Sequence, residues 1–226
     1  MLFSGIEILS DTANLARLSE GLAVTVRIAV ITIIFALIFG MVLGVIALNR
    51  SKIVQIPYQI FLQAIRVVPQ LVWLFLFFFG FAKWFGWNWG GETTGIVVFS
   101  IWGTAEMADL VRASISSLPT HQTQSAAALG LSRLQIYLFV LIPQAIRRLI
   151  PASINLATRI IKTTPLLVLI TVVEVLKVGQ QLIEATILTN ATAAFWIYGL
   201  IFIIYFLICF PVALLSRKLE AKWSVQ

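Results

Sequence analysis

Residues 119–148 read PTHQTQSAAALGLSRLQIYLFVLIPQAIRR, a polar and small-residue segment between two apolar blocks. The alanines at 126–128 favour a helix whose side chains are small, and Thr120 is placed to cap its start. Gly130 can adopt a positive φ, which ends helices at little cost. The first half of the segment therefore predicts one short helix that stops at Gly130.

A second short helix is predicted to follow directly. Ser132 and Gln135 form the capping-box pattern S-x-x-Q, which opens a helix. Pro143 comes too late to support that helix, so it predicts an end or a kink. Two interpretations of the whole segment remain open at this point. It is either a smooth surface held by another protein or an ordinary loop between helices.

The composition indicates a polytopic, all-α membrane protein. The chain has 226 residues, of which 60% are hydrophobic and 11% charged, whereas soluble domains are about half apolar and about a quarter charged. The single cysteine, Cys209, excludes an intramolecular disulfide. We predict one domain over residues 1–226 with five transmembrane helices, at about 22–48, 53–82, 93–112, 152–173 and 193–215.

Local features mark several of these spans. Gly40 and Gly44 form a small-xxx-small face that lets another helix approach closely. Pro57 and Pro69 are expected to bend or interrupt the second span. Residues 174–192 are interpreted as a polar connection between the last two spans.

The distribution of charge predicts the orientation. Five spans place the two termini on opposite sides, and one side holds nine basic residues against three on the other. The rule that lysine and arginine gather inside places the richer side in the cytoplasm. The N-terminus is then outside, the C-terminus and residues 119–148 are cytoplasmic, and the net charge of +7 needs no nucleic acid. The nine are Arg50, Lys52, Arg112, Arg133, Arg147, Arg148, Arg217, Lys218 and Lys222; the three are Arg17, Lys83 and Lys177.

Six ionisable residues fall inside the predicted spans, where each needs a partner or a wet cavity. They are Arg27, Arg66, Glu106, Asp109, Arg159 and Lys162. Arg27 is close to the start of its span and is expected to reach towards the interface. Asp109 and Arg112 are three apart and can pair along one helix. Glu106 has no such local partner.

A polar stripe on the fourth span is the most informative of these features. Asn155, Arg159 and Lys162 are spaced by four and three, which places them on one face of a helix. Lys162 is about 15 Å from the start of the span, near the membrane midplane. Residues 163–165, Thr-Thr-Pro, then predict a break in the helix. The stripe either lines a solute path, where it suits a carboxylate, or pairs with acids of the bundle.

No enzyme constellation competes with these features. His121 is the only histidine, and the sequence contains no phosphate-binding G-x-x-x-x-G-K-[ST] pattern. If transport is driven by ATP, the ATPase is therefore another polypeptide, and no cofactor is expected in this chain.

Several segments resemble one family. Gln124-Ser125-Ala126, followed by Gly130 and by Pro143 thirteen residues later, resembles the EAA motif of ABC-importer permeases. Residues 66–69, 108–112 and 162–166 are similar to that family's R-G-x-P-L, A-E-I-x-R and K-D-T-S-L segments. The surrounding residues resemble the polar amino-acid branch, the histidine/glutamine permease type.

The resemblance implies a type I ABC-importer transmembrane domain in the bacterial cytoplasmic (inner) membrane. Its partners would be a second permease subunit, the same or similar, and two ATPase subunits that bind ATP and Mg. An extracytoplasmic solute-binding protein would deliver the amino acid. The ATPase-coupling role falls on Gln124, Ser125, Ala126, Gly130 and Pro143. The substrate-path candidates are Arg66, Glu106, Asp109, Asn155, Arg159, Lys162 and Thr164. Glu106, Asn155 and Arg159 are included because of their positions in the predicted spans, and the other four because they match the family's segments.

Two departures from the family pattern concern its functional segments. Gln124 stands in place of the motif's glutamate, and Thr163 in place of the aspartate after the lysine. A glutamate-, glutamine- or aspartate-like solute is the favoured substrate, because Arg159 and Lys162 can meet a second polar end group. The alternatives are a self-sufficient channel or secondary carrier, and a membrane scaffold whose buried charges are structural.

Overall fold

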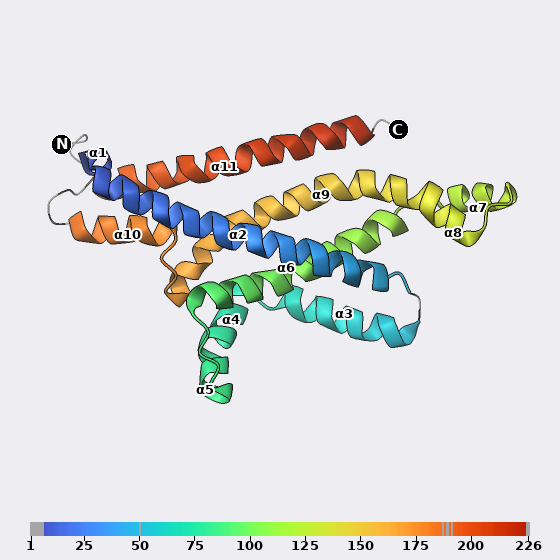
Figure 1. Ribbon diagram of the computed structural model, residues 1–226, viewed down its shortest axis with the longest axis horizontal. Helices are drawn as coiled ribbons and strands as arrows, with labels where there is room; N and C mark the ends of the chain where they lie inside the picture. The colour runs from blue at the N-terminus through green and yellow to red at the C-terminus, as the bar shows by residue number, and fades with distance from the viewer. Residues whose placement is uncertain (1–6, 50, 187, 189, 191, 225–226) are drawn as a thin grey trace. The chain divides into compact units, whose positions relative to one another are not determined.

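A computed structural model of the chain describes residues 7–49, 51–186, 188, 190 and 192–224, and every element within them is a helix (Figure 1). Arg50, one of the nine basic residues counted above, lies outside the described residues. In chain order the elements are α1 Glu7–Ser10, α2 Thr12–Ile46, α3 Lys52–Val67, α4 Gln70–Phe75, the π-helical η2 Leu76–Gly80, α5 Phe81–Phe85, α6 Gly91–Ser116, α7 Thr120–Ala128, α8 Arg133–Gln135, the π-helical η3 Ile136–Leu141, α9 Ile142–Thr163, the 3-10 segment η4 Thr164–Ile170, α10 Val175–Thr186 and α11 Ala193–Ser224.

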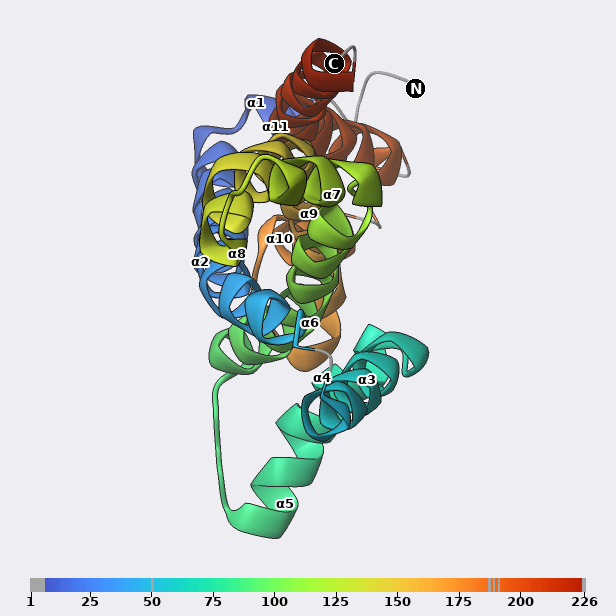
Figure 2. The same cartoon turned by 90° about the vertical axis from the view of Figure 1, so that its right-hand side faces the viewer.

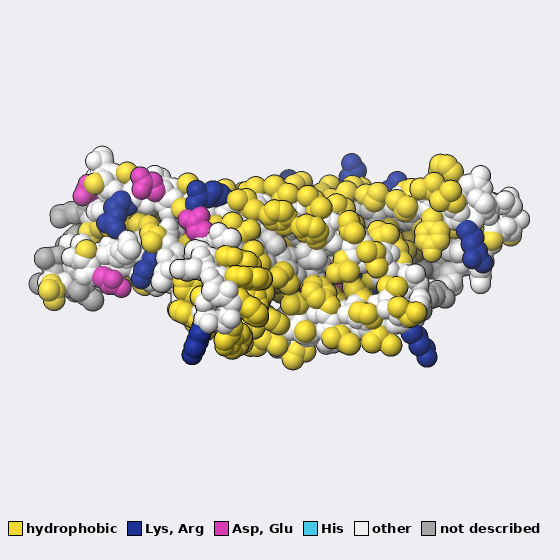
Figure 3. Space-filling model, turned by 60° about the horizontal axis from the view of Figure 1, so that its bottom comes forward, with side chains coloured by type: hydrophobic (Ala, Val, Ile, Leu, Met, Phe, Trp, Pro, Cys, Tyr) yellow, Lys and Arg dark blue, Asp and Glu magenta, His cyan; other side chains and the backbone are white. Residues whose placement is uncertain are grey.

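The described residues contain four helices that are long and apolar enough to cross a membrane: Thr12–Ile46, Gly91–Ser116, Arg133–Ile170 and Ala193–Trp223. A broken pair, Lys52–Val67 with Gln70–Phe85, is a fifth if it forms one span. Hydrophobic side chains cover most of the face in Figure 3, as expected for a surface in lipid. The 35 residues of α2 extend about 50 Å, so this helix continues well beyond a hydrocarbon core of about 30 Å.

One of the two prolines expected in the second span interrupts it. Val68 ends α3 in an extended conformation, with ψ 128°, and Pro69 then precedes α4. The proline ring excludes the preceding residue from the α conformation, which explains the break. Pro57 lies inside α3, and the helix continues past it to Val67.

The chain divides into two compact units, and the boundary falls inside α2, α6, α9 and α11. The first unit comprises Met1–Thr32, Pro69–Phe99 and Arg159–Pro211; the second comprises Ile33–Val68, Ser100–Thr158 and Val212–Gln226. The first unit has two buried clusters. One centres on α10, and the other joins Ile28, Leu74, Phe99 and Leu167.

Helix α10 corrects the sequence prediction that residues 174–192 form a polar connection. It buries Val175, Val178 and Leu182, spaced as one helical face, against Leu18 and Ile197. A Cβ on Gly179 would lie 2.4 Å from Ile201 Cδ1, so only glycine permits this approach. The prediction failed because glutamines and a glycine interrupt the apolar pattern, and only packing shows their positions to be part of a helix.

The second unit contains the close approach that Gly40 and Gly44 predicted. A Cβ on Gly40 would lie 2.4 Å from Met107 Cβ, and one on Gly44 would lie 2.5 Å from Val111 Cβ. Both contacts join the end of α2 to α6. The interpretation of this pair as a packing face is confirmed.

Candidate functional site

Residues 119–148 are called the coupling segment below, after the role that the family resemblance implies. The first helix of this segment is α7, and the start of α7 differs from the prediction. Pro119 is the N-cap residue, with φ −61° and ψ 132°, and no side chain caps the helix. Thr120 is already the first helical residue. The fixed φ of proline suits an extended cap position, so the helix begins one residue earlier than a threonine cap would require.

The end of α7 is as predicted at Gly130. This residue has φ 81°, and two backbone bonds close the helix around it. Leu131 N–H donates to Ala126 O at 3.2 Å, and Gly130 N–H donates to Ala127 O at 3.0 Å. These two bonds define a Schellman motif. They fix the direction in which the chain leaves α7 towards α8 (Figure 2).

The predicted capping box is also present. Gln135 N–H donates to Ser132 Oγ at 3.3 Å, and Ser132 N–H donates to Gln135 Oε1 at 2.8 Å. A small buried core packs against both helices. Its buried members are Leu118, Ala126, Ile136, Leu141 and Ala145. The coupling segment is therefore a packed helix pair and not an irregular loop.

Pro143 does not end the second helix, so of the two predicted outcomes, an end or a kink, the end is excluded. The π-helical segment Ile136–Leu141 precedes it, with Ile142 N–H paired to Tyr137 O, five residues back. The helix then continues as α9 to Thr163. A proline clashes with the carbonyl four residues before it. The wider π turn moves the preceding carbonyls into another pairing register, so the helix passes through the proline.

The motif residues have different surroundings. Ala126 is 5% exposed and packs in the core beneath α7, whereas Gln124, Ser125 and Gly130 are exposed. Gln124 also lines a cavity of about 800 Å³ together with Arg112 and Arg133. Among the described residues that line this cavity there is no carboxylate. Gln124 thus shares this cavity with two arginines, of which Arg112 is paired with Asp109.

Three candidate path residues of the second unit, Arg66, Glu106 and Asp109, belong to one ion-pair cluster. Arg66 Nε lies 2.9 Å from Glu106 Oε1, and Arg66 NH1 lies 2.8 Å from Asp109 Oδ2. Arg112 NH2 lies 2.7 Å from Asp109 Oδ1, which confirms the predicted pair along one helix. Arg66 comes from α3 and the acids from α6, forty residues away, so no local pattern indicated this partner for Glu106.

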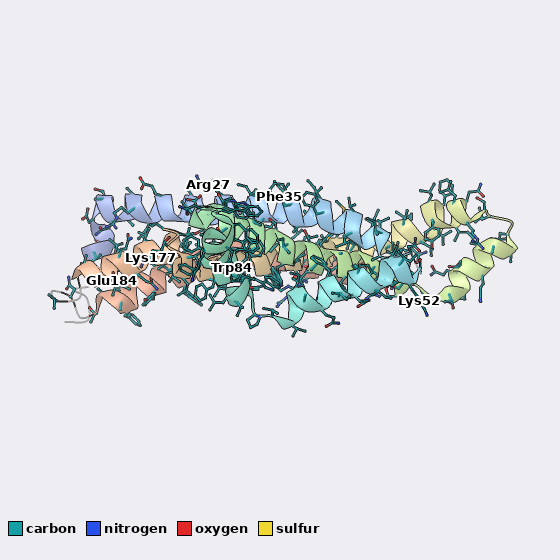
Figure 4. The ribbon with its side chains drawn as sticks, turned by 90° about the horizontal axis from the view of Figure 1, so that it is seen from below. Arg27, Phe35, Lys52, Trp84, Lys177 and Glu184 are labelled. Atoms are coloured by element: carbon teal, nitrogen blue, oxygen red, sulfur yellow. The ribbon has the colours of Figure 1, made fainter. Side chains whose placement is uncertain are left out.

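Arg27 is paired in the first unit. Arg27, labelled in Figure 4, lies in the interior of α2 and not near a helix start as expected. Its guanidinium contacts the carboxylate of Glu92. Both side chains are substantially exposed, 56% and 44%. A pair this exposed contributes about 0–1 kcal/mol, so its role is orientation at an interface.

The predicted stripe of α9 is on an exposed face. Asn155, Arg159 and Lys162 are all exposed, whereas Leu156 and Ile160 of the opposite face are buried. The break predicted at residues 163–165 is present, because the α-helix ends at Thr163 and continues as the 3-10 segment. Exposed polar groups on a membrane helix need water or protein around them.

Thr164 differs from the other path candidates because it is fully buried in the first unit. Its hydroxyl is 2.8 Å from Ile161 O and 3.2 Å from the Tyr205 hydroxyl. Tyr205 in turn donates to Glu174 Oε2 at 3.2 Å. Thr164 therefore stabilises the helix break through buried hydrogen bonds, two residues after the exposed Lys162.

Sequence reasoning missed Glu174, which it counted among the residues of a polar connection. Its side chain is fully buried. Lys177 N–H donates to its Oε1 at 2.9 Å, which caps α10, and the Thr25 hydroxyl is 3.3 Å from Oε2. Burial raises the pKa of the Glu174 carboxyl, while these donors oppose the shift. Glutamate is not a preferred cap residue, so the sequence held little signal for this role.

Replacement of Thr25 by valine tests this network. Thr25 Oγ1 accepts from Val175 N–H and lies 3.3 Å from Glu174 Oε2, so the variant removes the partner of the Val175 N–H and one of the two hydroxyl groups at Glu174 Oε2. We expect a loss of about 1–3 kcal/mol in the free energy of unfolding. Thr32→Val on the same helix is the control, since the Thr32 hydroxyl is buried without a hydrogen-bond partner among the described residues. Thermal unfolding in detergent measures both, and equal shifts would contradict the assignment.

Comparison with known proteins connects this architecture to transport. Residues 36–225 match the family described as "Binding-protein-dependent transport system inner membrane component". The chain is 27% identical to the "Probable glutamine ABC transporter permease protein GlnP" of Bacillus subtilis, over 92% of this chain and 94% of that protein. It is 28% identical to the "Glutamate transport system permease protein GluD" of Corynebacterium glutamicum, over 89% and 73% of the two chains.

Solved structures share the fold. A chain of the "Crystal structure of an amino acid ABC transporter with histidines" superposes with a TM-score of 0.83 at 22% identity, covering 93% of this chain and 98% of that one. A chain of the MetNI methionine ABC transporter in an inward-facing conformation gives 0.72 at 20% identity, covering 92% and 99%.

Proposed function

The chain belongs to the inner membrane components of binding-protein-dependent transport systems, and from this premise we propose that α7 is the surface on which the importer's ATPase docks. The protein is a multi-pass permease of the inner membrane. The ATPase and the substrate-binding protein are separate partners of such a permease. Force from ATP binding and hydrolysis therefore has to enter this chain through a contact surface.

The observation that carries the proposal is the construction of the α7–α8 pair. Its turn is closed by the two bonds around Gly130, its second helix by the capping box, and its base by the core around Ala126. A helix held in this way moves as one rigid body when the ATPase bound to its exposed face moves. Gln124 and Ser125 lie on the exposed surface and supply the contact.

The proposed assembly has two permease subunits, this chain and a second that is the same or similar. It also has two ATPases that bind ATP and Mg. The exposed stripe of α9 supports a second permease. Lys162 is a charged side chain on the exposed face of a spanning helix, and lipid around it would be costly. A neighbouring permease with a wet path between the two copies removes that cost.

The proposed substrate is an amino acid with an acidic or amide end group. Lys162 supplies a cation for the α-carboxylate, and Arg159 lies one turn before it on the same face. Arg66, Glu106, Asp109 and Arg112 form a cluster of two cations and two acids in the second unit, so their charges balance. The names of similar proteins include glutamine and glutamate permeases, which agrees with this substrate class.

Reconstituted transport tests the proposal. The native complex purified through a tag on this chain is expected to contain an ATPase, and its proteoliposomes should take up labelled glutamine or glutamate only with ATP and binding protein present. Uptake by the purified chain alone, without ATP, would instead establish a self-sufficient carrier. A complex in which Lys162→Ala impairs assembly and leaves the uptake kinetics unchanged would establish the scaffold interpretation.

A further inference from the structure

A second pocket lies in the second unit, between the start of α9 and the end of α11. It has a volume of about 430 Å³. Its polar lining comes from Arg147, Arg148, Asn155, Glu220 and Trp223. The two helices are joined beside it, because Ser216 Oγ donates to Pro151 O at 2.8 Å and both residues are buried.

The pocket is cationic. Two adjacent arginines face one acid in its lining, and α11 adds the exposed Arg217, Lys218 and Lys222 close to Glu220 in the sequence. Arg148 is fixed in place, since its NH1 donates to Ser117 O at 3.1 Å and to Ser117 Oγ at 2.9 Å. A guanidinium carries five N–H donors, so this anchoring orients Arg148 and still leaves donors for an anion.

Three exposed aliphatic side chains are close to the pocket lining in the sequence. Ile150 of α9 is 37% exposed, and Leu214 and Leu215 of α11 are 39% and 51% exposed. Trp223 is partly buried at the pocket, and tryptophan is typical of the membrane–water boundary. Exposed aliphatic side chains next to paired arginines and a tryptophan match a ligand with a charged head and an apolar tail.

We infer that this pocket binds the phosphate headgroup of an anionic phospholipid. Arg147 and Arg148 take the phosphate oxygens, which arginine contacts in a bidentate geometry. Trp223 lies against the glycerol region, and the acyl chains extend over Ile150, Leu214 and Leu215. A free phosphate would use the arginines alone and would gain nothing from the apolar rim. Basic pockets between spanning helices are a recurrent form of lipid site.

The proposal does not depend on the transport function, because it requires only that the chain is in a membrane. It assigns Asn155 to this lipid pocket at the start of α9, apart from the role given to Lys162. Two positive charges in a partly enclosed site, added to the attraction of the leaflet, should produce selective binding to anionic lipid.

Titration of delipidated complex in detergent, followed by native mass spectrometry, tests the site. The probes are phosphatidylglycerol, phosphatidylcholine and inorganic phosphate, at physiological ionic strength. We expect phosphatidylglycerol alone to bind, and the double variant Arg147→Gln/Arg148→Gln to weaken it about thirty-fold. Arg217→Gln/Lys218→Gln removes the same charge outside the pocket lining and should weaken it less than about three-fold, since salt screens distant charges.

Two outcomes would overturn the assignment. Equal losses in the two double variants would mean diffuse attraction to a basic surface, and equal binding of inorganic phosphate would mean a free-anion site. Arg147→Gln alone covers the case in which the double variant misfolds, because it keeps the bonds from Arg148 to Ser117. This single variant should weaken phosphatidylglycerol about five-fold, and an unchanged affinity would also reject the site.

Discussion

Replacement of Gly130 by valine should reduce ATP-driven uptake more than ten-fold while the permease still assembles with its partners. Gly130 has φ 81°, and a Cβ there would meet no atom within 4 Å. The effect is therefore not steric crowding. It is the backbone strain of a β-branched residue in a left-handed conformation, about 1–2 kcal/mol or more. The backbone relieves that strain by leaving this conformation, which breaks the bonds from Leu131 and Gly130 to the end of α7.

The expected phenotype is uncoupling, with ATP hydrolysis continuing but no longer stimulated by the loaded binding protein. Two variants separate this from general damage. Gly130→Asn should keep most of the uptake, because asparagine tolerates a positive φ. Gly199→Val places the same side chain at a helical glycine that also has open space and no positive φ, and should be nearly neutral. Normal ligand-stimulated turnover in Gly130→Val would exclude α7 as the coupling element.

The second large effect is expected at Lys162. Its replacement by alanine should raise the KM for uptake at least ten-fold, because a charge-assisted bond to the solute carboxylate contributes about 1.5–3 kcal/mol. Assembly and basal ATP hydrolysis should be unchanged, since Lys162 is exposed on its helix. Initial rates of labelled uptake over a range of solute concentrations give the KM.

Arg27→Ala is the matched control for Lys162→Ala, because it also removes one cation from a spanning helix. Arg27 pairs with Glu92 in an exposed position, so its loss should change uptake less than two-fold. Similar changes in the KM for uptake in the two variants would contradict the assignment of Lys162 to the solute path.

The local structure of the coupling segment was predictable because its signals are local. A positive-φ glycine, a capping box and a run of alanines each determine the backbone within four or five residues. The same holds for the close-packing face of Gly40 and Gly44, whose spacing places both glycines on one side of a helix. The predicted threonine cap was wrong, and of the end or kink predicted at Pro143 the end is absent. In both places two local rules compete, and the neighbouring backbone decides between them.

By itself, then, the sequence determined a membrane protein of spanning helices, with a helix pair at residues 119–148 and a polar stripe ending at Lys162. Only the tertiary structure decided which distant groups meet. Arg66 joins Glu106 across forty residues, and the buried Glu174 joins Thr25 and the partly buried Tyr205. The physical reason is that a charge in lipid must find a partner, but its spacing along the chain specifies only those within one turn. Packing brings the remaining partners together.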